Sequence, residues 1–181
     1  MADNLDVTRL WNQPLSLAEV QRNAVQRTLE ADDAVRGRIA KALGLESLSR
    51  LDARLKVSPW LDGVEVDGRW SATVGQICGV TLDPFETALN GEIHLRALPA
   101  GSQALGERDE HEVDLDPEAD DPPDVLDSDQ IDLGAYVVEA LSLHIDPFPR
   151  KPGATFEAPV QSGELSPFAV LAKLKGHEPD A

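Results

Sequence analysis

The stretch LDARLKVSPWLDGVEVDGRWSATVGQIC, residues 51–78, carries the strongest structural pattern in the chain. From Leu51 to Val57 apolar residues alternate strictly with polar ones, which is typical of a strand with one buried face. Further along, Val64–Val66 and Arg69–Cys78 flank Asp67-Gly68, a dipeptide that favours tight hairpin turns. We therefore predict one strand followed by a β-hairpin that turns at Asp67-Gly68.

The pattern continues on the C-terminal side of this stretch. Phe85–Leu98 is the next strand candidate, and its alternating residues Ile93, Leu95 and Ala97 would face the core. The dipeptide Asn90-Gly91 lies inside this segment, and if it forms a tight turn the segment becomes two short strands. Residues 5–10 could add a short first strand.

Four other segments have helical features. Leu15 to about Glu30 has loose helical spacing, and Asp33–Leu43 has a clearer apolar stripe that ends before Gly44. Leu133–His144 follows Asp132, which can cap the helix, and about 166–175 forms a C-terminal docking helix. Strands flanked by helices predict an α+β fold with a mostly antiparallel sheet, in a single domain spanning 1–181.

Composition and charge narrow the class of protein. The 181 residues are 41% hydrophobic, without a secretory signal pattern or an apolar run long enough for a bilayer, so we expect a cytoplasmic protein that contacts no membrane. The formal net charge is −17, but residues 1–60 carry nine Lys/Arg and eight Asp/Glu. Residues 107–132 carry thirteen Asp/Glu and one Arg. One acidic loop, at about 106–130, therefore supplies most of the imbalance.

This acidic loop suits a basic protein partner, and five of its residues form the candidate partner surface. These are Asp114, Asp116, Glu118, Asp120 and Asp121. The first three imitate the start of a calcium loop, but Ala119 and Val125 replace the glycine and glutamate that the loop requires. We assign no metal or other cofactor here.

No motif supplies a nucleophile, a base and an oxyanion donor together, so we expect no enzyme and no catalytic residue. The four histidines are scattered, and Cys78 is a single cysteine without the further ligands that zinc requires. Cys78 is best interpreted as a small buried residue at the end of a strand.

The loop after the 133–144 helix, PFPRKPG, is the sharpest candidate contact site. Pro147 and Pro149 fix the backbone around Phe148, so that Arg150 and Lys151 are held at a defined place. These cations could bind RNA phosphates, and Phe148 could stack on a base or fill a partner pocket. Equally, Phe148 could close the core and Arg150 could pair with Asp146. Lys173 and Lys175 in the C-terminal segment are further candidate contacts.

Three blocks of the sequence resemble a known family. The string IDLGAYVVEALSLHIDPFPRKPG at 131–153 is similar to the core signature of the YceD family, the large ribosomal RNA subunit accumulation proteins. ICGVTLDPF at 77–85 and SPFAVLAKLK at 166–175 resemble the blocks before and after it, in the same order. Many members carry paired cysteines near the 77–85 block, whereas this chain has only Cys78.

The resemblance implies a non-enzymatic role in 23S ribosomal RNA accumulation or processing and in large-subunit assembly. The partner would be precursor RNA, bound through Arg150, Lys151 and the basic residues of the N-terminal half, or a basic ribosomal protein shielded by the acidic loop. An RNA-processing hydrolase is a third interpretation. The sequence leaves the oligomeric state open.

Overall fold

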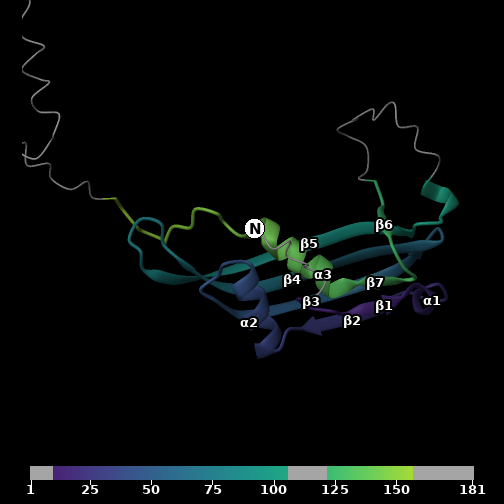
Figure 1. The fold of residues 1–181 in the computed structure, drawn as a ribbon, viewed down its shortest axis with the longest axis horizontal. Coiled ribbons are helices and arrows are strands. Elements are labelled where there is room, and N and C mark those ends of the chain that lie inside the picture. The colour runs from purple at the N-terminus through teal and green to yellow at the C-terminus, as the bar shows by residue number, and fades with distance from the viewer. Residues whose placement is uncertain (1–9, 106–121, 157–181) are drawn as a thin grey trace, which may run out of the picture.

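The structure is a computed structural model that describes residues 10–105 and 122–156. Its long strands lie side by side in one sheet, and α3 and the short β1–β7 pair lie against one face of it (Figure 1). The elements in chain order are β1 Pro14–Ser16, α1 Leu17–Val20, β2 Val25–Glu30, α2 Asp33–Ala42, β3 Ser47–Trp60, β4 Gly63–Ile77, β5 Pro84–Pro99, the 3-10 helix η2 Gln103–Leu105, β6 Asp124–Leu126, β7 Gln130–Asp132 and α3 Leu133–His144.

The predicted mostly antiparallel sheet is confirmed. Five strands lie in the order β2-β3-β4-β5-β6, and every neighbouring pair is antiparallel except β5 and β6, which are parallel. The parallel strand β6 was not predicted. Residues 106–121, the main part of the acidic loop, lie outside the described residues. The predicted strand at 5–10 and the predicted helix at about 166–175 lie wholly or almost wholly outside them as well.

The alternating pattern from Leu51 to Val57 is confirmed within β3. Leu51, Ala53, Leu55 and Val57 are all at most 2% exposed, while the residues between them are partly or fully exposed. β4 and β5 continue the buried face with Trp70, Val74 and Ala97 among others. One face of the sheet therefore forms the core, and the other faces solvent.

The prediction of a hairpin turn at Asp67-Gly68 is wrong. β4 runs unbroken through this dipeptide, and the turn lies instead at Leu61-Asp62, between the paired residues Trp60 and Gly63. Leu61 takes the positive φ of 51° that the turn needs. Leucine rarely adopts this conformation, but Asp62-Gly63 is a second Asp-Gly dipeptide at this point, and the prediction chose the wrong one of the two.

The alternative turn at Asn90-Gly91 is also wrong, because β5 runs unbroken from Pro84 to Pro99. Both glycines meet a neighbouring strand too closely to carry a side chain. A Cβ on Gly68 would lie 2.3 Å from the carbonyl oxygen of Arg54, and one on Gly91 would lie 2.8 Å from Nε1 of Trp70. Glycine here marks close packing inside a strand.

Two of the helix predictions are confirmed. α2 begins after Asp32, whose side chain accepts a hydrogen bond from the Val35 N–H, and Gly44 follows its C-cap with a φ of +66°. α3 spans Leu133–His144 as expected. Among the described residues, no helix is long and apolar enough to cross a membrane.

The prediction of a helix from Leu15 to about Glu30 is wrong. Only the four residues of α1 are helical, and they lie between β1 and β2. β2 pairs along its whole length with β3, with Leu29 buried opposite Ala53. Helical spacing in this segment is weak, and pairing with the edge of β3 satisfies the backbone of β2 while burying Leu29.

The side chain of Asp132 connects the start of α3 to the segment just before β1. Its Oδ1 atom accepts hydrogen bonds from the N–H groups of Gly134 and Ala135, at 3.0 and 3.3 Å, and so caps α3. The same atom accepts a 2.8 Å hydrogen bond from the Gln13 N–H, next to β1. One carboxylate therefore fixes the start of α3 against the β1–β7 pair.

We expect the substitution Gly134→Ala to lower the free energy of unfolding by about 1–3 kcal/mol, because the added Cβ would overlap a neighbouring backbone. That Cβ would lie 2.0 Å from the carbonyl oxygen of Trp11. Gly37→Ala in α2 is the matched control, since its Cβ would meet nothing within 4 Å. This control should stabilise the protein by about 0.5–1 kcal/mol. Urea unfolding measures the free energy of unfolding of both variants. An equal change in the two variants would contradict the close contact between Gly134 and Trp11.

Candidate functional site

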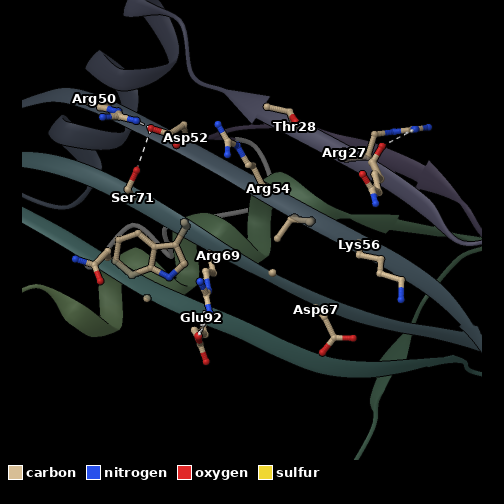
Figure 2. Close-up of a pocket in the computed structure, with 16 residues that line it drawn as sticks. Arg27, Thr28, Arg50, Asp52, Arg54, Lys56, Asp67, Arg69, Ser71 and Glu92 are labelled. Carbon is tan, nitrogen blue, oxygen red and sulfur yellow. Dashed lines mark hydrogen bonds and ion pairs between the residues drawn. The ribbon is translucent and has the colours of Figure 1, made fainter.

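The solvent-facing side of the sheet holds a trough of about 830 Å³ that many charged residues line. Side chains from β2, β3, β4 and β5 point into it, as Figure 2 shows. Its charged lining residues are the cations Arg50, Arg54, Lys56 and Arg69 and the anions Asp52, Asp67 and Glu92. Arg27 also lines the trough, but it lies opposite the buried Leu55 and pairs with Glu19 at 2.5 Å. The trough therefore has an excess of positive charge in a chain whose net charge is −17.

Strand pairing places like charges together in the trough. Arg54 on β3 lies directly opposite Arg69 on β4, an arrangement that ordinarily destabilises a sheet. Arg69 is partly neutralised by Glu92, whose Oε1 lies 3.1 Å from its Nη2. Arg54 and Lys56 form no ion pair with any described residue. These two cations are exposed and are free to bind an anion from solution.

Other side chains hold part of the trough in place. Asp52 accepts hydrogen bonds from Arg50 Nε at 2.5 Å and from Ser71 Oγ at 3.0 Å.

The sequence could have indicated this surface, because Arg50, Arg54 and Lys56 occupy the exposed positions of the alternating strand. It could not show that Arg69 of the neighbouring strand lies beside them, since that depends on the register.

The structure places the predicted loop at the end of the sheet. Phe148 is 80% exposed, so it does not close the core, and its N–H donates to Asp146 Oδ1 at 2.8 Å. Arg150 is exposed, and it pairs neither with Asp146 nor with any other described acid. Lys151 Nζ lies 3.6 Å from Asp83 Oδ2, so its charge is partly balanced.

Cys78 is buried directly after β4, as expected, and it connects this loop to the sheet. Its Sγ accepts hydrogen bonds from the N–H groups of Val80 at 3.4 Å, Thr81 at 3.5 Å and Lys151 at 3.4 Å. The N–H of Gly79 also donates to the carbonyl of Pro149 at 2.9 Å. Two loops far apart in sequence are thus held together at one sulfur atom.

The same contacts change the acidity of the thiol. The Thr81 hydroxyl contributes most, followed by the N–H groups of Lys151 and Thr81, and together they lower the pKa of Cys78 from 9.0 to about 6, although burial acts against them. No basic side chain is needed for this effect. The largest contributor, Thr81, lies only three residues from Cys78, whereas Lys151 lies 73 residues away and is brought close by the fold.

The remaining predicted site residues lie outside the part of the chain that the structure describes. They are Asp114, Asp116, Glu118, Asp120, Asp121, Lys173 and Lys175. Within the described residues, no three His, Cys, Asp or Glu side chains cluster closely enough to hold a metal ion.

We expect Cys78 to stabilise the fold more as the pH rises from 6 to 9. The folded-state pKa of its thiol is about 6 and the ordinary value is 9.0, so the stabilisation is complete above pH 9 and is lost as the pH falls through 6. Urea unfolding of the wild type and of Cys78→Ser across this range measures the effect. A stability difference that stays constant with pH would contradict a thiolate in the folded protein.

Comparison with known proteins identifies the family of this chain. No match was found among curated proteins or among solved structures. Residues 66–175 match the family described as Large ribosomal RNA subunit accumulation protein YceD. This match includes most of β4, all of β5 and α3, and both loops that meet at Cys78. Because it covers more than half of the chain, the protein belongs to the YceD family.

Proposed function

We propose that this chain is a non-enzymatic factor that binds precursor RNA of the large ribosomal subunit and supports its accumulation and assembly. The family indicates a role in large-subunit RNA accumulation. The observation that carries direct RNA binding is the trough, in which Arg54 and Lys56 extend from a rigid sheet without an ion-pair partner among the described residues.

The strongly negative net charge does not prevent this contact. At physiological ionic strength, charges more than about 8 Å apart in solvent are largely screened from each other. An approaching phosphate therefore responds mainly to the cations that line the trough. Arginine suits this task because its planar guanidinium can donate two parallel hydrogen bonds to one phosphate.

The lining favours contact with the RNA backbone more than reading of bases. Thr28, Ser71 and Asn90 add neutral hydrogen-bonding groups between the cations. Such groups bind phosphate and sugar oxygens and position the protein without selecting a sequence. Selection of large-subunit RNA would then come from its folded shape or from a second contact.

The loop carrying Phe148, Arg150 and Lys151 is the alternative RNA contact. Its exposed aromatic ring could stack on an unpaired base. The charges around it favour RNA less than those of the trough, because Asp83 balances Lys151 and Asp146 lies beside Phe148. We therefore place the main contact in the trough.

We expect the double substitution Arg54→Gln and Lys56→Gln to weaken binding of a large-subunit precursor transcript by about tenfold or more. Each lost phosphate contact should also reduce the slope of log K against log salt by roughly 1. Fluorescence anisotropy at several salt concentrations measures both quantities. Arg22→Gln with Lys41→Gln is the matched control, because it removes the same charge from exposed positions outside the trough.

Two results would overturn parts of this proposal. If the control and trough variants weaken binding equally, the trough is not the contact. If Arg150→Ala with Lys151→Ala abolishes binding while the trough variant does not, the contact lies at the loop. The transcript should also stay intact with added magnesium or manganese, since cleavage by the purified chain would contradict a non-enzymatic role.

A further inference from the structure

A second cavity lies beside the Cys78 loop junction and shares no residue with the trough. It has a volume of about 330 Å³, which is at the lower end for small-molecule sites. Its apolar lining consists of Leu43, Leu45, Ile77, Ile145, Pro147 and Pro149. We refer to it as the junction pocket.

Two acidic residues and no cation accompany this apolar lining. Glu46 and Asp146 line the junction pocket, while no Arg or Lys does. Neither carboxylate forms an ion pair with a described residue. Asp146 uses one oxygen to accept the Phe148 N–H at 2.8 Å, and Glu46 is exposed. The pocket therefore combines apolar side chains with a larger area of polar surface, including negative charge that nothing described neutralises.

The walls of the junction pocket are fixed by hydrogen bonds before any partner arrives. Gln76 Nε2 donates to the carbonyl of Asp146 at 3.0 Å, which ties β4 to the loop after α3. The Glu46 N–H donates to the carbonyl of Gly75 at 2.9 Å, which ties the same strand to the α2–β3 connection. A preformed pocket loses little conformational entropy when a partner binds.

Exposed apolar side chains lie in the walls of the junction pocket and in the loop next to it. Ile77 is 41% exposed in the pocket wall, and Phe148 is 80% exposed in the loop that forms another wall. Leu82 is 75% exposed and has a positive φ of 60°, in the loop that the Cys78 sulfur joins to residues 147–151. Exposed apolar side chains around a pocket are typical of protein interaction sites.

We propose that the junction pocket binds a basic protein segment in which one large apolar side chain is flanked by lysine or arginine. The apolar side chain would fill the pocket as an anchor, and the flanking cations would face Glu46 and Asp146. RNA is a poor occupant because its phosphates would meet these carboxylates.

The test uses defined peptides and the full chain. The peptide RKRFRKR should shift the amide resonances of the pocket residues in a nuclear magnetic resonance titration. RKRARKR, which lacks the anchor, should bind about tenfold or more weakly, because a buried aromatic side chain contributes most of the affinity at such sites. If both peptides bind equally, only general charge attraction operates and the proposal fails.

A pair of substitutions locates the site. Ile77→Asn should weaken binding of RKRFRKR by about tenfold, since it places a polar group in the pocket wall. Leu143→Asn is the matched control, because Leu143 is 78% exposed on α3 and lies outside the pocket. Equal effects of the two substitutions, or resonance shifts confined to residues outside the pocket, would overturn the proposal.

Readouts on RNA keep this proposal separate from the function of the trough. Neither Ile77→Asn nor Leu143→Asn changes the charge, so both should bind the precursor transcript like the wild type. Loss of transcript binding with Ile77→Asn alone would show that the pocket belongs to the RNA contact and would contradict a protein partner. Thermal unfolding followed by circular dichroism confirms that each variant is folded.

Discussion

The register of β3, β4 and β5 is the constraint on which the rest of the structure depends. Side chains alternate between the two faces of a strand, so a shift of one residue would exchange every buried and exposed position. In the observed register Leu55 and Trp70 enter the core while Arg54 and Arg69 face solvent. The two-residue turn at Leu61-Asp62 sets the pairing of β3 with β4, and so it fixes which side chains of these two strands enter the core and which line the trough.

Patterns that depend on neighbouring residues were predictable from the sequence. The alternation from Leu51 to Val57, the cap at Asp132 and the bounds of α3 all follow from short-range rules, and the structure confirms them. The resemblance to the YceD family rested on the blocks at 77–85, 131–153 and 166–175, and the matched residues include all three. In these places the local preference and the tertiary structure agree.

Features that depend on distant residues were not predictable. The glycines at 68 and 91 were interpreted as turn signals, but they are required because Arg54 and Trp70 of the neighbouring strands leave no room for a Cβ. The lowered pKa of Cys78 comes mainly from the nearby Thr81 hydroxyl, but a backbone N–H of Lys151, which only the fold brings close, adds to it. The trough likewise combines residues of four strands whose order cannot be obtained from spacing along the chain.

The two cavities suit different partners within one small protein. Unpaired cations line part of the trough, whereas apolar side chains and two carboxylates line the junction pocket. Binding RNA at one and a basic protein segment at the other would let the chain hold both components of a growing subunit. Such an adaptor needs no catalytic group, and its two contacts can be removed separately by mutation.

The most direct test of this account is ultraviolet cross-linking of the full chain to a large-subunit precursor transcript, followed by mass spectrometry of the attached peptides. We expect the cross-linked peptides to come from β3 and β4 around Arg54, Lys56 and Arg69. At these positions the cations that line the trough are unpaired or only partly paired among the described residues. Cross-links confined to the loop at 147–151, or to segments outside the sheet, would contradict the trough as the RNA contact.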